Sequence, residues 1–291
     1  MKTFINILSI ALSATFFSCG SPGTEPKASS KEKIQIAHEG VNIAYDDMGT
    51  GDTTLLFIHG WGINKTYWSN QDSFFSKSYR VVAVDLPGFG TSGKNRKSWS
   101  VEDYGKDLTA VLTSLDLKNV VLIGHSMSGA IALETALTNP TRVIGVVGID
   151  NFKNFGYIET DASKKETANI YKAVRANFKA TITEYVSQAL FAPSTDSAIK
   201  KRVLDDILSS DTIIAVNCME QGDQYPLNAK LSALKLPLNL INSSLTPTDT
   251  AAFKKGNIKY NLYDIGAVGH YPMLEKPQAF NDLLQRAIDG M

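Results

Sequence analysis

Short, nearly continuous apolar runs alternate with amphipathic stretches over the first half of the chain. A run of this kind, closed by small or polar residues, is typical of a strand buried on both faces of a parallel sheet. The four runs lie at residues 53–60, 80–88, 120–126 and 142–150. Because strands alternate with helices, the pattern predicts an α/β fold in which a mostly parallel sheet is flanked by helices. An antiparallel hairpin is expected before them, at residues 33–49.

One of the intervening segments, residues 100–117, shows the helical pattern clearly. Ser100 and Asp103 can form a capping arrangement at its start. Apolar residues then recur three and four positions apart and share one helical face, which Val101, Tyr104, Leu108, Val111, Leu112 and Leu115 form. The segment is therefore expected to pack against the sheet.

The alternation stops after Asp150. From there to Lys235 the pattern contains no convincing strand but several amphipathic helical stretches, of which residues 168–191 and 197–210 are the clearest. A long helical segment of this kind interrupts the succession of strands that builds a parallel sheet.

Strand patterns return at residues 236–244 and 257–266. We therefore expect residues 151–235 to form a helical cap inserted between two strands of one sheet, as in the α/β folds that carry such insertions. The core then consists of residues 34–150 and 236–291, and no internal repeat is visible.

The N-terminal residues have the pattern of an export signal. Lys2 precedes an apolar stretch, residues 4–17, which is short for a bilayer span, and a small residue precedes Cys19. This resembles a bacterial lipoprotein signal, which implies a signal peptide at residues 1–18 and lipidation of Cys19. Residues 19–33, rich in Gly, Pro, Ser and charge, are expected to be a flexible tether. The chain is then exported and lipid-anchored to a bacterial membrane, at its periplasmic or cell-surface face; the alternatives are ordinary cleaved secretion and a retained anchor.

Charge and cysteine content narrow the function classes. The 291 residues carry 29 basic and 29 acidic side chains and no long basic run, which argues against nucleic acid as a partner. Besides Cys19 the chain has only Cys218, so no intrachain disulfide framework is available. Cys218 falls in an apolar run, where a small buried side chain is expected rather than a nucleophile.

The strand-to-helix junction at residues 120–134 carries the main chemical signal. Nucleophilic acyl transfer needs an exposed hydroxyl, a base, an anion that orients the base, and N–H donors for the oxyanion. Ser126 ends the strand pattern where the helix pattern begins, so its hydroxyl is expected to project above the sheet edge near the positive end of the helix. Ser128 stands where the motif G-x-S-x-G has its last glycine, and we expect it to fit because that position requires a small side chain.

Of the four histidines, His270 is the candidate base, because it lies on the loop expected after the last strand. A loop at that place can bring an imidazole over the sheet edge. His125 adjoins Ser126, and successive side chains diverge at so sharp a turn, so we do not expect it to act as the base. His38 and His59 show no comparable placement.

Four motifs in order, "FIHGWG", "VVAVDLPGFGTSG", "VLIGHSMSGAIALETA" and "GAVGHYPMLEKPQAF", resemble those of the α/β-hydrolase superfamily, within its capped, esterase-like members. The resemblance extends from Ile34 to the C-terminus. It implies that Ser126 is the nucleophile and His270 the general base, and that the backbone N–H groups of Trp61 and Met127 form the oxyanion hole.

The acid of the triad departs from the pattern of many relatives. They carry it soon after the strand that follows the cap, and counting from Pro237 places Thr246 there, which cannot supply a negative charge. The acid is then Asp249, a few residues along, or Asp150, at the end of the strand before the cap. Asp150 is favoured because a carboxylate that ends a buried strand requires a partner, which His270 would be.

These features predict a serine hydrolase that cleaves a small-molecule carboxylic ester through an acyl-enzyme intermediate, with no metal or cofactor. Apolar cap residues are expected to line a hydrophobic entrance, among them Tyr171, Phe178, Tyr185 and Phe191. Two alternatives stay open. The same triad could act on an amide, a thioester or a carbon–carbon bond, or transfer an acyl group; or the chain could be a lipid-anchored binding protein that has lost turnover.

Overall fold

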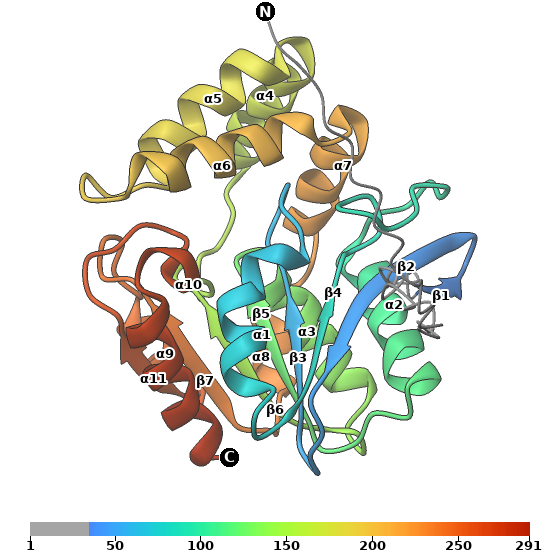
Figure 1. The fold of residues 1–291 in the computed structure, drawn as a ribbon. Coiled ribbons are helices and arrows are strands. Elements are labelled where there is room, and N and C mark those ends of the chain that lie inside the picture. Colours follow the sequence, from blue (N-terminus) through green and yellow to red (C-terminus); the bar gives the residue numbers. More distant parts are fainter. Residues whose placement is uncertain (1–34) are drawn as a thin grey trace, which may run out of the picture. The chain divides into compact units, whose positions relative to one another are not determined.

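The computed structural model describes residues 35–291, and Figure 1 shows the course of the chain. The expected signal peptide, Cys19 and the tether lie outside the described residues. The strands are β1 (Gln35–His38), β2 (Val41–Met48), β3 (Thr54–Ile58), β4 (Arg80–Val84), β5 (Val120–His125), β6 (Val143–Ile149), β7 (Leu238–Asn242) and β8 (Asn261–Asp264). The helices are η1 (Lys65–Trp68), α1 (Ser69–Phe75), α2 (Val101–Ser114), α3 (Ser128–Thr138), α4 (Asp161–Ala176), α5 (Phe178–Ala189), α6 (Ser197–Ser209), α7 (Thr212–Asp223), α8 (Leu227–Ala233), α9 (Thr250–Lys255), α10 (Pro272–Glu275) and α11 (Pro277–Asp289).

The strands form one eight-stranded sheet in the order β1-β2-β4-β3-β5-β6-β7-β8. The β1–β2 and β2–β4 pairs are antiparallel, and every other pair is parallel. This confirms the predicted mostly parallel sheet, with an antiparallel hairpin at one edge. Because the carboxyl ends of parallel strands meet at one edge of the sheet, residues that follow β3, β5, β6 and β7 are brought together there.

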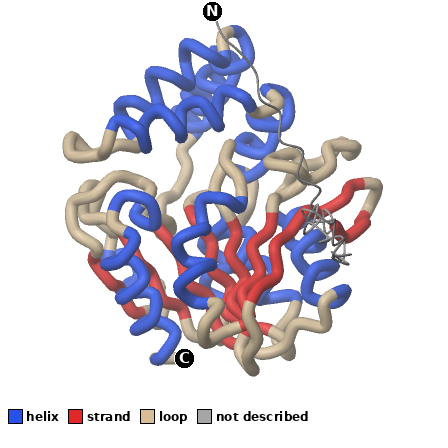
Figure 2. The backbone as a smooth tube through the Cα atoms, viewed as in Figure 1, coloured by secondary structure: helices blue, strands red, loops and turns tan. Residues whose placement is uncertain are grey.

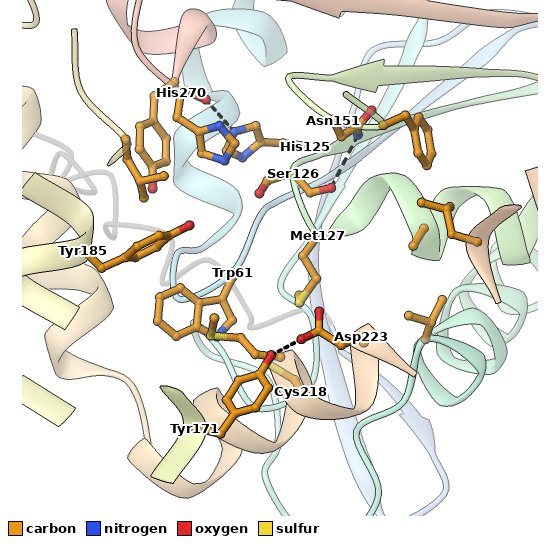
Figure 3. Close-up of a pocket in the computed structure, with 18 residues that line it drawn as sticks. Trp61, His125, Ser126, Met127, Asn151, Tyr171, Tyr185, Cys218, Asp223 and His270 are labelled. Carbon is orange, nitrogen blue, oxygen red and sulfur yellow. Dashed lines mark hydrogen bonds between the residues drawn. The ribbon is translucent and has the colours of Figure 1, made fainter. Parts of the chain in front are cut away.

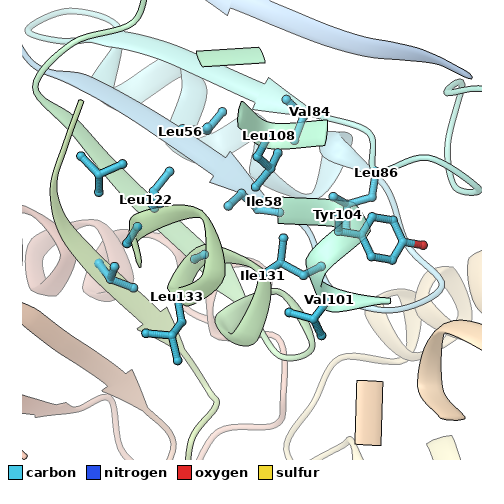
Figure 4. Packing of buried hydrophobic residues seen from close by; sticks show 14 of the residues in the cluster. Leu56, Ile58, Val84, Leu86, Val101, Tyr104, Leu108, Leu122, Ile131 and Leu133 are labelled. Carbon is cyan, nitrogen blue, oxygen red and sulfur yellow. The ribbon is translucent and has the colours of Figure 1, made fainter. Parts of the chain in front are cut away.

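Helices cover both faces of the sheet, as Figure 2 shows. Successive side chains of a strand point to opposite faces, so Leu56 and Ile58 of β3 pack with α2 and α3, whereas Leu55 and Phe57 pack with α1 and α11. Figure 4 shows the first of these layers, in which Leu108 and Ile131 meet the strand side chains. The predicted capping arrangement of α2 is present: the Ser100 hydroxyl accepts from the Asp103 backbone N–H at 3.1 Å.

The inserted segment lies between β6 and β7, and its helices α4 to α7 stand above the carboxyl ends of the strands (Figure 1). Helix α8 instead packs on α3 in the core, where Lys230 forms an ion pair of 2.6 Å with Glu134. Within the predicted range 151–235, the part that covers the strand ends is therefore α4 to α7.

None of the helices within residues 35–291 combines the length and the apolarity required to cross a membrane.

Candidate active site

Ser126 occupies a sharp turn between β5 and α3. Its φ angle is +54°, in the left-handed region that costs a non-glycine residue free energy and that is found at functional turns. The turn is held by two backbone hydrogen bonds of 2.9 Å, from the Ser126 N–H to the Ile149 carbonyl and from the Gly129 N–H to the Ser126 carbonyl. This geometry places the Ser126 side chain at the sheet edge, beside the first turn of α3.

Small residues permit this turn. A Cβ atom at Gly124 would lie 2.3 Å from the Ser128 carbonyl oxygen, and one at Gly129 would lie 2.2 Å from Asn151 Nδ2. Ser128 fits at the last position of the motif: it is fully buried, and its hydroxyl donates a hydrogen bond to the carbonyl of His59. The extra hydroxyl therefore ties the turn to the end of β3.

Asp150 and His270 are in direct contact. His270 Nδ1 lies 2.6 Å from Asp150 Oδ2, so the imidazole N–H donates to the carboxylate. Asp150 directly follows β6 and also has a positive φ, +47°, while His270 lies on the loop between β8 and α10. Burial acts to raise the pKa of Asp150, but the hydrogen bond and charge of His270 and the ammonium of Lys153 outweigh it, and the pKa of this carboxyl lies below its ordinary value.

The other oxygen of Asp150 is also fully engaged. Oδ1 accepts the backbone N–H of Ser243 at 2.9 Å, and the Lys153 ammonium lies 2.6 Å from it. Lys153 also donates to the Ser243 carbonyl at 3.0 Å. The carboxylate is thus fixed by a strand end, a lysine and a histidine that come from separate parts of the sequence.

The alternative acid, Asp249, lies elsewhere. Asp249 is exposed and caps α9, where its carboxylate accepts from the Ala252 backbone N–H at 3.0 Å. Thr246, which stands where many relatives carry an acid, is exposed. Of the two candidates for the acid, the structure brings only Asp150 to His270.

The loop that carries His270 is held from two sides. The His270 backbone N–H donates to the Leu190 carbonyl of the cap at 2.8 Å, and the His270 carbonyl accepts from His125 Nε2 at 2.7 Å. His125 is buried, and its burial, together with the neighbouring His270, lowers its pKa to about 3. A neutral, buried His125 therefore supports the loop through its Nε2, which is bonded to the His270 carbonyl.

Ser126 and His270 line the same pocket, as Figure 3 shows. Among the described residues no hydrogen bond joins the Ser126 hydroxyl to the His270 imidazole in this conformation. Such bonds often tighten only in the complex with substrate.

The two residues expected to supply the oxyanion N–H groups, Trp61 and Met127, both belong to the pocket that holds Ser126. Met127 begins the turn into α3, and Trp61 follows the glycine after β3; both residues line the pocket. Among residues 35–291, neither of these N–H groups donates to a protein acceptor. Trp61 itself is fixed by its indole N–H, which donates to the Ala215 carbonyl of α7 at 2.8 Å.

The pocket has a volume of about 290 Å³ and is lined by both apolar and polar side chains. Tyr171 and Tyr185 line it as expected, whereas Phe178 packs against Trp61 with ring centroids 6.4 Å apart. Cys218 is buried, and burial raises the pKa of its thiol to about 12, in keeping with the expected apolar role. A second pocket of about 390 Å³ shares Ser126 and His270 with the first and extends along Asp150 and Lys153.

Three residues of the site were not found from the sequence: Asn151, Lys153 and Asp223. Asn151 Nδ2 donates to the Gly124 carbonyl at 2.9 Å and so supports the turn at Ser126. Asp223, at the end of α7, faces the pocket and accepts a hydrogen bond from the Tyr171 hydroxyl. Asn151 and Lys153 lie one and three residues after Asp150, so the strand end itself was a signal; nothing in the pattern pointed to Asp223.

The chain is similar to known proteins over most of its length. A family model described as alpha/beta hydrolase fold matches residues 53–210. A 2-hydroxy-6-oxononadienedioate/2-hydroxy-6-oxononatrienedioate hydrolase of Escherichia coli is 26% identical over 279 residues, covering 90% of this chain and 96% of that protein.

Solved structures share the fold. A thermophilic esterase from Thermogutta terrifontis, in its malate-bound form, has a TM-score of 0.76 at 22% identity and covers 88% of this chain and 98% of its own. An enol-lactonase from Burkholderia xenovorans has a TM-score of 0.77 at 16% identity and covers 88% of this chain and 100% of its own.

Proposed function

The chain belongs to the α/β-hydrolase family, and we propose that it is a serine hydrolase that cleaves a carboxylic ester through an acyl-enzyme intermediate. The observation that carries this proposal is the 2.6 Å contact between His270 and Asp150, next to a serine on a strained strand-to-helix turn. A serine, a carboxylate and an imidazole, in this order along the chain, are the groups that acyl transfer requires.

In the proposed mechanism His270 Nε2 takes the proton of the Ser126 hydroxyl as its oxygen attacks the ester carbonyl. Asp150 accepts from Nδ1, which keeps the proton on that nitrogen and leaves Nε2 free to act as the base. The oxyanion that forms is stabilised by the backbone N–H groups of Trp61 and Met127, near the N-terminus of α3.

The ester carbon–oxygen bond then breaks, and His270 gives the proton to the departing alcohol. A water molecule repeats the sequence on the acyl-enzyme: His270 takes its proton, the hydroxyl adds to the carbonyl, and Ser126 leaves with the proton as the acid is released. The fixed position of Asp150 keeps the imidazole oriented through both halves of the cycle.

The experiment that tests this function is covalent labelling by a fluorophosphonate combined with hydrolysis of a panel of nitrophenyl esters. We expect labelling and ester hydrolysis in the natural chain and neither in Ser126→Ala. Folded protein that is not labelled would contradict the proposal and would favour a binding protein without turnover.

A second candidate reaction comes from the Escherichia coli relative, whose named substrates are hydroxy-oxo-dicarboxylates. The same serine, histidine and aspartate could act on such a compound, on an amide or on a thioester. We place the ester first because no Lys or Arg of the described residues lines the pocket that holds Trp61 and Met127, and a dicarboxylate would lack a cationic partner there. Preferential turnover of a dicarboxylate over every ester of the panel would reverse this order.

We also propose that Cys19 is lipidated and anchors the enzyme to a bacterial membrane, on the pattern of the first residues. The full-length protein should sediment with membranes, and Cys19→Ser should release it. If the Cys19→Ser protein stays in the membrane fraction, a lipid on this residue is not the anchor.

A further inference from the structure

Among the residues that the structure describes, the lining of the pocket that contains Trp61 and Met127 has a negatively charged side chain but no positively charged one. Asp223 is its only carboxylate, and no Lys or Arg among residues 35–291 belongs to its lining. The remaining walls are apolar or neutral and include Met127, Tyr185 and Leu227. An anionic group that entered this space would lose hydration without gaining a cationic partner.

Asp223 presents one oxygen to the pocket. The Tyr171 hydroxyl donates to Oδ2, and no hydrogen bond to Oδ1 is present among the described residues; Asp223 and His270 line the same pocket (Figure 3). Asp223 is also the last residue of α7, where the free backbone carbonyls of the helix add negative potential. The position therefore favours a group that donates a hydrogen bond.

The surroundings of Asp223 do not neutralise it. Glu220 and Glu159 lie near enough to raise its pKa, after the larger contribution of burial. Glu220 itself is paired with Arg175, which also donates to the Asn217 amide oxygen. The far end of the pocket thus carries a net negative potential.

The two pockets are expected to hold different parts of the substrate, one the acyl group and the other the alcohol. An ester carbonyl must lie between the N–H groups of Trp61 and Met127, and both residues line the pocket that contains Asp223 and not the second pocket. His270 lines both pockets, and we assign the departing alcohol to the second one, which continues along Gly269 and Lys153. The pocket that contains Asp223 is therefore the acyl side.

We propose that the acyl group of the substrate carries a hydrogen-bond donor, a hydroxyl or an amine, which binds Asp223, and that acyl groups ending in a carboxylate are disfavoured. This proposal rests on the proposed serine hydrolase function. It separates this chain from the Escherichia coli relative, whose named substrates are dicarboxylates.

The test is a series of nitrophenyl esters of equal acyl length, made from hexanoic, ω-hydroxyhexanoic, ω-aminohexanoic and adipic acids, the last as a monoester. At pH 8 we expect kcat/KM of the two donor esters to exceed that of the adipate ester by about tenfold or more, because like charges brought together in a pocket repel. In Asp223→Asn this ratio should fall by about threefold or more, and in Asp223→Lys the adipate ester should become the better substrate.

Asp205→Asn is the matched control, since it removes one carboxylate from the exposed surface of α6, where Asp205 pairs with Lys201. In Asp205→Asn the ratio of kcat/KM between the donor esters and the adipate ester should equal that of the natural chain. An adipate ester cleaved as fast as the donor esters, or an Asp223→Asn ratio equal to that of Asp205→Asn, would overturn the proposal. Hydrolysis of the hexanoate ester and fluorophosphonate labelling report the hydrolase function separately, so its failure would not be confused with a failure of selectivity.

Discussion

The Lys153 ammonium lies 2.6 Å from Asp150 Oδ1, while His270 occupies the other oxygen of the same carboxylate. The Lys153 side chain is only 12% exposed, so this ion pair is formed in a region of low solvent access. A cation on the far oxygen holds the carboxylate in place and keeps it ionised, which is the form that orients an imidazole.

Replacing Lys153 by Met should therefore weaken catalysis through Asp150, whose far oxygen loses its cationic partner. We expect kcat/KM to fall about tenfold near neutral pH and further in acid, because Asp150 then holds its proton more tightly. The pH profile of kcat/KM measures this, and its acid limb should move to higher pH. Lys153→Arg keeps the charge and should recover much of the loss. An unshifted profile in Lys153→Met would show that the lysine only supports the fold.

The choice of acid can be tested by two matched substitutions. Asp150→Asn should lower kcat by about 10⁴-fold, because an amide cannot stabilise the imidazolium that forms. Asp249→Asn should leave kcat within a few fold, since Asp249 is exposed and Asn caps a helix as well as Asp does. Steady-state kinetics on one ester compares the two variants, and the opposite ranking would contradict our assignment.

The turn at Ser126 should not accept a larger residue at Gly124. The Cβ of Gly124→Ala would lie 2.3 Å from the Ser128 carbonyl oxygen, and relief of that overlap has to move backbone. We expect a loss of about 1–3 kcal/mol of stability, together with loss of labelling. Gly222→Ala is the control: outside its chain neighbours and the backbone of its own helix nothing lies within 4 Å of the added carbon, and Ala favours the helix. Thermal unfolding that is equal in the two variants would contradict this account of the turn.

A buried carboxyl outside the site should make stability depend on pH. Burial, with Asp46 nearby, raises the pKa of Asp72 to about 7, and its Oδ1 has no hydrogen-bond partner among the described residues. A carboxyl whose folded-state pKa is raised contributes stability at low pH that is lost as pH rises through that pKa. From pH 5 to pH 8 we expect this group to remove about 2 kcal/mol.

Asp72→Asn should abolish that contribution. As pH rises, the natural chain should lose stability that the variant keeps, so the unfolding free energy of the variant should increase relative to that of the natural chain. Urea unfolding at pH 5 and pH 8 provides the measurement. The two proteins have to be compared because the buried His125, whose pKa is lowered, makes stability increase as pH rises, opposite to the effect of Asp72. This effect of His125 is the same in the natural chain and in the variant, so it cancels in the difference. A difference that does not change with pH would show that Asp72 is ionised throughout.

The pattern of apolar and polar residues along the chain was sufficient to predict the architecture of the sheet and its flanking helices. Continuous apolar runs indicate strands buried on both faces, and their alternation with helices permits few arrangements other than a parallel sheet with helices on either side. The turn at Ser126 could also be located, because a strand pattern changes to a helix pattern at that residue with only small residues around it. Both features depend on neighbours in the sequence, and local pattern is enough to predict them.

The partners within the site depend on contacts between distant segments. From the sequence, Asp150 and Asp249 both stayed candidates, and the pairing of β6 with β7 and the course of the β8–α10 loop bring Asp150 to His270 while Asp249 caps α9. Asp223 reaches the pocket only because α7 folds back over the strand ends. No periodicity records such contacts, since they are set by how whole elements pack, and only the tertiary structure decides which carboxylate meets the histidine and which lines the pocket.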